Sequence, residues 1–396
     1  MVDSLQRIFP RKNNVNLSSI VDAQVFGPDG GFAPGTVAIS DGRFVAAAEA
    51  PAGSVVDASG LWLIPGVYDC HTHLVWSDFH AHDREARSDA ERGLQLERAL
   101  RDTLHAGVTS ARDAGGTTAA VRDAIADGSL EGPRVRVAVD MIGADDAGPT
   151  FRSRVVGALE AGADWIKLVG TIGVGALAGQ ELRSHFTEAE YRFAVETARE
   201  AGARVMVHAW GGEAIDHAVE TGVASIEHGM YLTPAQAAKA AAASVTFVPT
   251  LTIYRLVRQM VAAGELAGVP LDRVDAVLST HRQAVLSAYD AGLPIAIGSD
   301  FSTVEQHGTN LVEIAALMRA GLPAADALFA ATRNGAALLA DADGGTIAPG
   351  FRADAVLLKN DPTDPATFDD PHSVVGVVAN GELVHFDPTA VSPSHP

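Results

Sequence analysis

The sequence predicts an α/β fold built on a (β/α)8 TIM barrel, with a small β-sandwich domain formed by both ends of the chain. From residue 62 to about residue 340, short apolar runs typical of strands alternate with helical segments, which favours a barrel over a doubly wound sheet. Residues 1–60 and the C-terminal segment lack helical periodicity and contain strand-like runs between Gly, Pro and Asp residues. No phosphate-binding glycine motif follows a predicted strand, which weakens a dinucleotide-binding interpretation.

Eight apolar runs have the composition of buried strands. The first begins at residue 61 and continues into a pair of histidines. The others are residues 107–113, 134–139, 163–169, 204–208, 224–227, 245–249 and 294–300. Predicted helices lie between them, at residues 89–105, 152–161, 187–201, 213–220, 234–242 and 272–291. Thr187, with Glu190 three residues later, forms the capping box expected at a helix start.

Both ends of the chain contain strand-like runs without helical periodicity, whereas in the middle strand-like runs alternate with helical segments. Strand-like runs occupy residues 18–25, 35–39, 43–47, 353–358, 374–378 and 383–386. Asn380 and Gly381 are typical of a two-residue hairpin turn. We therefore expect residues 1–61 and 345–396 to form one β-sandwich domain, and residues 62–344 to form the barrel.

The composition is that of a globular enzyme. Of the 396 residues, 47% are hydrophobic, which provides material for a large core. The net charge of −20 argues against nucleic-acid binding and against docking on anionic membranes. No apolar stretch reaches the ~20 residues of a membrane span, and residues 1–16 lack the apolar core of a signal peptide. We expect a cytoplasmic protein that acts on a small-molecule substrate.

The strongest local feature is the pair His71 and His73 at the end of the first predicted barrel strand. Side chains at positions i and i+2 of a strand point to the same face, so both imidazoles can converge on one point. Neutral imidazoles suit a borderline divalent ion such as zinc. Taken alone, the pair is equally compatible with two structural histidines. Cys70, the one cysteine of the chain, lies on the alternate face and is expected to be a buried structural thiol.

Polar side chains also stand at or near the carboxyl ends of several other predicted strands. They are Lys167 on the fourth strand, His208 on the fifth, His228 on the sixth and Asp300 on the eighth. The carboxyl ends of barrel strands meet at one face, where side chains from different strands can share a ligand. A single histidine after an apolar strand is commonly structural, but histidines on three separate strand ends together with Asp and Lys predict a metal site.

Lys167 needs its own explanation, because an ammonium group beside a dication would be repelled and poorly solvated. A lysine that reaches solvent or pairs with a carboxylate is the alternative, but the apolar neighbours Ile166 and Leu168 disfavour it. Carboxylation of the amine by CO2 would give an anionic carbamate that can bridge two metal ions. Composition does not show this modification.

These segments resemble the metal-dependent amidohydrolase superfamily, and the resemblance covers nearly the full chain. It is carried by residues 65–73, 165–167, 207–209, 226–229, 298–300 and 345–354. The resemblance implies two divalent ions, with zinc expected, although His and Asp ligands alone do not separate zinc from manganese, cobalt or iron. It places His71, His73, Lys167 and Asp300 around the more buried ion, and carboxylated Lys167 with His208 and His228 around the more exposed one. Relatives often form rings or dimers, so a homo-oligomer is implied as well.

The element Ile226-Glu227-His228-Gly229, followed by Tyr231, is similar to the imidazolonepropionase-like subgroup, which includes prolidase-type and Xaa-amino-acid carboxypeptidases. In those relatives a tyrosine at this position helps to polarise the scissile carbonyl, so Tyr231 is a catalytic candidate; a rim aromatic that only packs is the alternative. Where those relatives have a Ser-Gly-Gly run after the lysine, this chain has Gly170-Thr171-Ile172, and this departure weakens the case for their peptide-carboxylate specificity. Candidate substrate contacts are Trp76, Trp210, Tyr231 and His307.

The reaction implied is hydrolysis of a C–N bond in an amide, peptide or carbamate, such as an N-acyl amino acid, a dipeptide or a xenobiotic amide. Bound dications lower the pKa of water to about 7 and supply hydroxide, and Asp300 passes the water's proton to the leaving amine. One alternative is a mononuclear deaminase or cyclic-amide hydrolase acting on a heterocycle, but such deaminases usually carry a Glu where this chain has Gly211. The other is a non-catalytic assembly protein, which the complete ligand set disfavours.

Overall fold

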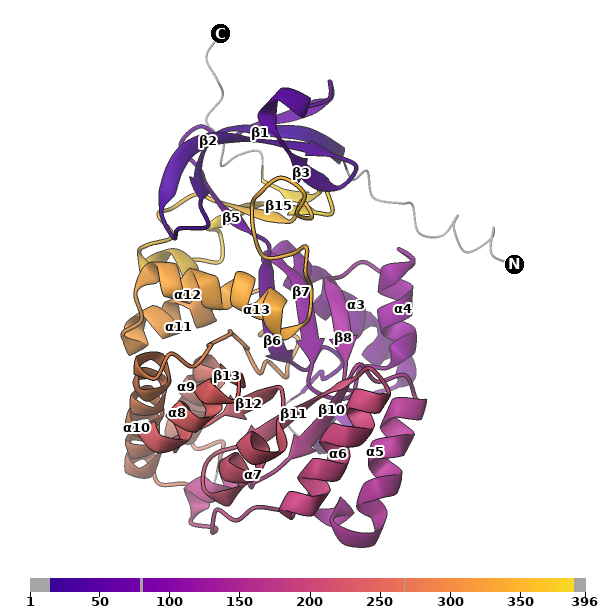
Figure 1. The fold of residues 1–396 in the computed structure, drawn as a ribbon, viewed down its shortest axis with the longest axis vertical. Coiled ribbons are helices and arrows are strands. Elements are labelled where there is room, and N and C mark those ends of the chain that lie inside the picture. Colours follow the sequence, from indigo (N-terminus) through magenta and orange to yellow (C-terminus); the bar gives the residue numbers. More distant parts are fainter. Residues whose placement is uncertain (1–14, 79–80, 267, 388–396) are drawn as a thin grey trace, which may run out of the picture.

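The computed structural model describes residues 15–78, 81–266 and 268–387. A mixed β-sheet lies at one end of the molecule, and parallel strands flanked by helices make up the rest (Figure 1). The signal-peptide prediction concerned residues 1–16, and residues 1–14 lie outside the described residues. Residues 388–396 of the predicted β-sandwich also lie outside them.

The mixed sheet contains eight strands from both ends of the chain. The N-terminal part supplies β1 (Val15–Phe26), β2 (Phe32–Ser40), β3 (Arg43–Val45), β4 (Ser54–Asp57) and β5 (Trp62–Pro65). The C-terminal part supplies β14 (Ala355–Leu358), β15 (Val374–Ala379) and β16 (Glu382–Phe386). Strand β5 joins the two parts, because it pairs in parallel with β1 and antiparallel with β14.

The predicted opening strand is two strands in the structure. Strand β5 belongs to the mixed sheet, whereas β6 (Val67–Thr72), which carries His71, pairs in parallel with β7 (Val108–Asp113). Gly66 lies between them, and a Cβ atom at this position would stand 2.3 Å from the Thr109 hydroxyl oxygen. The chain therefore changes sheets at a residue that must lack a side chain. Hydrophobic periodicity does not reveal this change, because nearly every residue of both strands is buried and neither strand alternates between buried and exposed positions.

The parallel strands form two sheets, one with the order β6-β7-β8 and one with the order β13-β12-β11-β10-β9. Their remaining members are β8 (Arg134–Val137), β9 (Met141–Ile142), β10 (Trp165–Val169), β11 (Arg204–Ala209), β12 (Ser225–His228) and β13 (Thr246–Val248). The predicted third strand, residues 134–139, corresponds to β8, which ends at Val137 and pairs with β7; β9, just beyond the predicted range, pairs with β10. Between β8 and β9, Val139 has a φ of 64°, a left-handed conformation that interrupts strand pairing.

The predicted eighth strand, residues 294–300, is extended chain with one isolated bridge rather than a regular strand. It nevertheless hydrogen-bonds on both sides. The Phe247 amide of β13 donates to the Pro294 carbonyl (2.8 Å), and the Cys70 amide of β6 donates to the Ile297 carbonyl (2.9 Å). Gly298 permits this approach, since a Cβ atom there would stand 2.6 Å from the Cβ of His71.

Helices lie around the parallel strands (Figure 1). Those that the sequence predicted are α3 (Asp89–His105), α5 (Phe151–Glu160), α6 (Glu188–Glu200), α7 (Glu213–Thr221), α8 (Pro234–Ala242) and α10 (Leu271–Asp290). The structure adds α2 (Ala81–Ala86), α4 (Ala119–Ala126), α9 (Leu251–Ala262), α11 (Val312–Ala320), α12 (Ala324–Ala331) and α13 (Arg333–Leu338). The capping box of Thr187 and Glu190 is confirmed. Within the described ranges, no helix has both the length and the apolar character to cross a membrane.

Candidate active site

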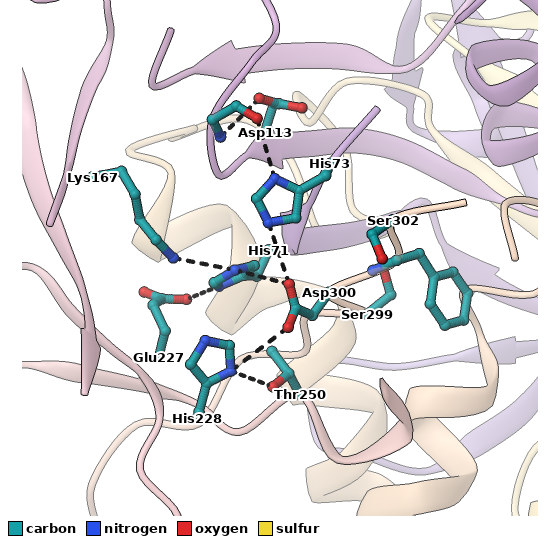
Figure 2. Close-up of polar contacts among 12 residues, drawn as sticks. His71, His73, Asp113, Lys167, Glu227, His228, Thr250, Ser299, Asp300 and Ser302 are labelled. Atoms are coloured by element: carbon teal, nitrogen blue, oxygen red, sulfur yellow. Dashed lines mark hydrogen bonds and ion pairs between the residues drawn. The ribbon is translucent and has the colours of Figure 1, made fainter. Parts of the chain in front are cut away.

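Five of the six predicted strand-end side chains lie close together in Figure 2: His71, His73, Lys167, His228 and Asp300. One carboxylate oxygen of Asp300 lies 3.3 Å from the Nε2 atom of His71 and 3.3 Å from the Nε2 atom of His73. The potential ligand atoms of these three residues all lie within 4.8 Å of one another. Lys167 on β10 adds its Nζ atom at 3.3 Å from His71 Nε2. The imidazole rings of His208 and His228 are neighbours, with centroids 4.4 Å apart.

The Nδ1 atom of His71, on the side of the ring away from Asp300, contacts a buried ion pair between Glu227 and Arg112. The sequence did not indicate this pair. The Glu227 carboxylate lies 2.6 Å from His71 Nδ1 and accepts two further contacts from the Arg112 guanidinium at 2.9 and 3.0 Å. Burial alone would raise the pKa of Glu227, but Arg112 and His71 lower it to about 2. An ionised carboxylate only accepts hydrogen bonds, so Nδ1 of His71 carries the proton and Nε2 presents its lone pair to the site.

His73 is fixed in a similar way by the loop that follows β7. Its Nδ1 atom donates to the Gly115 carbonyl at 3.1 Å. The Asp113 carboxylate shapes that loop, because it accepts the amide hydrogens of Leu74 (2.8 Å) and Gly115 (2.9 Å). The Trp76 ring stacks on the His73 imidazole at 4.0 Å. Both histidines of the predicted pair therefore direct Nε2 towards Asp300.

Lys167 is 3% exposed, and burial lowers the pKa of its amine to about 8. A neutral amine is the form that reacts with CO2, and this pKa makes that form accessible near neutral pH. Nearby, the Nε2 atom of His208 is buried and has no hydrogen-bond partner among the described residues. A buried imidazole nitrogen without a partner is costly unless a ligand occupies it.

Three residues of the site have left-handed backbone conformations, with φ of 70° for His228, 54° for Thr250 and 53° for Asp300. Such conformations cost energy for residues with side chains and often occur at functional sites. The Thr250 hydroxyl lies 2.7 Å from His228 Nδ1, and an Asp300 oxygen lies 3.9 Å from the same nitrogen. Although burial opposes ionisation of Asp300, the imidazoles of His71 and His228 and the His73 contact hold its pKa well below the ordinary value.

The family described as "Amidohydrolase family" matches residues 62–384. The chain belongs to the amidohydrolase family. Membership makes it a hydrolase of carbon–nitrogen bonds and agrees with the superfamily that the sequence motifs resemble.

Several relatives match most of this amidohydrolase. Ochratoxinase from Aspergillus niger is 26% identical over 364 residues, which cover 81% of this chain and 75% of the relative. Imidazolonepropionase from Deinococcus deserti is 27% identical over 350 residues, which cover 79% of this chain and 81% of the relative.

The fold also matches solved amidohydrolase structures. A prolidase complexed with N-methylphosphonate-L-proline has a TM-score of 0.82 and 26% identity, with 93% of this chain and 99% of that chain covered. The structure of A. niger ochratoxinase has a TM-score of 0.81 at 22% identity, covers 95% of this chain and 97% of that chain, and is a likeness of fold. Imidazolonepropionase and prolidase among these matches agree with the subgroup that the sequence resembles.

The predicted substrate contacts of the amidohydrolase occupy different environments. Trp76 is half-buried against His73, whereas Trp210 is fully buried and donates its indole hydrogen to the Tyr254 hydroxyl at 3.0 Å. Tyr231 is half-buried, with its ring 6.5 Å from that of Trp210. His307 is buried, with Nδ1 3.2 Å from the Thr103 hydroxyl of α3. None of these contacts involves a substrate, so the four assignments stay predictions.

The donor set fits divalent ions. His71, His73 and Asp300 present nitrogen and oxygen atoms at mutual distances that one ion can span, and the partnerless Nε2 of His208 is what a ligand to a second ion would have. The residues that the sequence analysis missed, Arg112 and Glu227, lie one layer behind these donors. The sequence signal for each was a charged residue inside a predicted strand; both residues are buried in the structure.

Proposed function

We propose that this amidohydrolase is a metal-dependent hydrolase that cleaves the C–N bond of an amide, peptide or carbamate in a small molecule. N-acyl amino acids, dipeptides and xenobiotic amides are the proposed substrates. The observation that carries the proposal is the convergence of His71, His73 and Asp300, with Lys167 Nζ at 3.3 Å from His71 Nε2. The family generally uses a metal.

Two zinc-like ions would be held by donors from five strand ends. His71, His73, Asp300 and carboxylated Lys167 are the proposed ligands of one ion, and Lys167, His208 and His228 of the other. When bound, such ions lower the pKa of a coordinated water towards neutrality and polarise a carbonyl oxygen. The pKa of about 8 for Lys167 supports its carboxylation, because a fully protonated amine does not react with CO2.

The protein's own groups would move the protons. Asp300 is ionised and directed into the site, so its carboxylate would accept a proton from the attacking water. The water oxygen bonds to the carbonyl carbon, the C–N bond breaks, and Asp300 delivers the proton to the leaving nitrogen, which departs as a neutral amine. Tyr231 is proposed to hydrogen-bond the substrate carbonyl.

The names of relatives support an amide or peptide bond as the target. Relatives named ochratoxinase and prolidase match over most of this chain. The deaminase alternative receives less support, because Gly211 stands where deaminases of the superfamily carry a glutamate, and a Cβ atom there would lie 2.8 Å from the Tyr231 Cβ.

We also propose that the two parallel sheets form one closed (β/α)8 barrel spanning residues 62–344, with residues 1–61 and 345–396 forming the β-sandwich. Residues 294–300 support closure because they hydrogen-bond to both β13 and β6. The run from β8 to β9 supports it because it contributes to both sheets. A homo-oligomeric state and a cytoplasmic location are proposed from the resemblance and the composition, respectively.

A substrate panel tests the proposed function. Metal-replete wild type and Asp300→Asn would be assayed with N-acyl amino acids, dipeptides, carbamates, anilides and, for contrast, aminated heterocycles. We expect release of an amine from at least one amide class by the wild type, and a fall of kcat of about 10³-fold in Asp300→Asn with bound metal retained. Ammonia release from heterocycles alone, or normal turnover by Asp300→Asn, would contradict the proposal.

A further inference from the structure

Tyr254 lies beside the candidate metal ligands but has no role in the reaction described so far. It is on the first turn of α9, which follows β13, and it is 5% exposed. Its ring packs edge-to-face on the His228 imidazole, with centroids 5.7 Å apart. On another side it packs against His281 of α10, at 5.6 Å. The phenol ring therefore packs against His228, the last residue of β12 and a candidate metal ligand.

Within the described part of the chain, the Tyr254 hydroxyl accepts a hydrogen bond but donates none. Trp210 Nε1 donates to its oxygen at 3.0 Å, which fixes the oxygen in place. The hydroxyl hydrogen has no acceptor among the residues that the structure describes. Buried donors without acceptors are rare, because each one costs free energy. A ligand that brings an oxygen acceptor into the site would satisfy this hydrogen.

The hydroxyl keeps its hydrogen at neutral pH. A phenol ordinarily loses its proton only near pH 10. The His228 imidazole on which the phenol packs has its Nδ1 atom 3.9 Å from an Asp300 oxygen, so the phenol lies beside the site. Tyr254 is therefore suited to donating a hydrogen bond, not to acting as a base.

The start of α9 is held in position from two directions. The Glu313 carboxylate of α11 accepts the amide hydrogens of Leu251 (2.5 Å) and Thr252 (2.9 Å), together with the Thr252 hydroxyl (2.6 Å). The residue before the helix, Thr250, contacts His228 at 2.7 Å. Tyr254 is thus placed by a fixed helix end, which is the pre-organisation that an oxyanion donor requires.

We propose that Tyr254 is a further catalytic residue, whose hydroxyl donates a hydrogen bond to the substrate oxygen that becomes negative when water adds to the carbonyl carbon. This inference rests on the proposed C–N hydrolysis. As the new C–O bond forms, the π electron pair of the carbonyl moves onto that oxygen. When the carbonyl re-forms, the C–N pair leaves with nitrogen, which takes the proton from Asp300. Tyr254 keeps its own proton throughout and strengthens its hydrogen bond as charge develops.

The test compares Tyr254→Phe with the wild type on a substrate that the wild type cleaves. We expect kcat to fall about 10²–10³-fold, as for removal of one oxyanion donor, with KM within threefold of wild type and metal content unchanged. Tyr191→Phe is the matched control: Tyr191 is a buried phenol on α6, and its replacement should leave kcat and KM unchanged. Wild-type kcat in Tyr254→Phe would overturn the inference, and so would an effect confined to KM.

A binding measurement gives a second readout that does not depend on turnover. A phosphonate analogue of the cleaved substrate, in which tetrahedral phosphorus replaces the carbonyl carbon, carries the oxygen that Tyr254 should contact. Calorimetry should show weaker phosphonate binding to Tyr254→Phe by about the factor lost in kcat, and unchanged binding of the product amine. Equal phosphonate affinity in both proteins would reject Tyr254, whereas a wild type that cleaves no C–N bond would reject the proposed function.

Discussion

The candidate site has two sides, the first with His71 and His73 and the second with His208 and His228. The protein supports the imidazoles of these two sides differently. On the first side, both Nδ1 atoms are engaged, His71 with Glu227 at 2.6 Å and His73 with the Gly115 carbonyl at 3.1 Å. On the second side, the His208 imidazole has a backbone hydrogen bond with Ile172, and His228 Nδ1 lies 2.7 Å from the neutral Thr250 hydroxyl. The supports of the imidazoles on the first side thus include the ionised Glu227 carboxylate, whereas those on the second side are neutral groups. We expect the first side to bind metal more tightly.

The largest expected effect concerns the residue that links the two sides. Lys167→Ala should lower kcat by at least about 10³-fold and lose the second-side ion, because the bridging carboxylate would be gone. Added short carboxylic acids should restore part of the activity. Metal content by mass spectrometry and turnover with and without acetate or propionate measure both effects. Unchanged activity in Lys167→Ala would contradict the proposal that a carboxylated Lys167 is required for catalysis.

Glu227→Gln tests the support of the first side. Replacing the carboxylate weakens the orientation of His71 and leaves the buried Arg112 charge without its counter-ion. We expect metal affinity to fall about 10–100-fold, and the free energy of unfolding to fall by about 3–5 kcal/mol. Metal titration of the folded variant, with thermal unfolding measured in parallel, checks each number. An affinity equal to that of the wild type would mean that His71 needs no support.

Thr250→Val is the corresponding change on the second side and should have a smaller effect. It removes a contact between a neutral hydroxyl and His228 Nδ1 without leaving a buried charge unpaired. Neutral hydrogen bonds are about half as strong as charge-assisted ones, so we expect a loss of less than about tenfold in affinity for the second ion. A loss larger than that of Glu227→Gln would reverse the comparison between the two sides.

A separate effect, on stability and not on metal binding, is a pH dependence that comes from Glu313, which holds α9 beside the second side. Burial raises the pKa of Glu313 from the model-compound value of 4.5 to about 7, against the lowering effect of its hydrogen bonds. A raised carboxyl pKa gives stability that is complete below pH 4.5 and is lost as the pH rises towards 7. In this window the wild type should lose about 1.4 kcal/mol per pH unit relative to Glu313→Gln. Denaturant unfolding at several pH values measures this difference; parallel curves for the two proteins would contradict it.

Residues at strand ends could be found from the sequence because strand geometry is regular. The i, i+2 spacing placed His71 and His73 on one face, and the same rule for barrel ends brought Lys167 and Asp300 to them. Contacts that depend on pairing between distant strands could not be found. Arg112 and Glu227 are 115 positions apart, and nothing local indicates that they meet.

Local breaks in the chain were also hidden. The sheet change at Gly66 and the left-handed Val139 interrupt runs that look continuous in composition. Helix α9 was missed because it has no side-chain cap of its own at its start; Glu313, 62 residues further on, binds its first amide hydrogens instead. Nothing local in the sequence therefore indicates that Tyr254 lies beside His228.

The central claim is that these strand ends bind divalent ions that the hydrolysis requires. Protein freed of metal by chelation and dialysis would be titrated with zinc while amide turnover and bound metal per chain are measured together. We predict no turnover in the stripped protein and recovery that reaches its maximum at two ions per chain, with the first ion bound more tightly. Full turnover by protein that contains no metal would contradict the account.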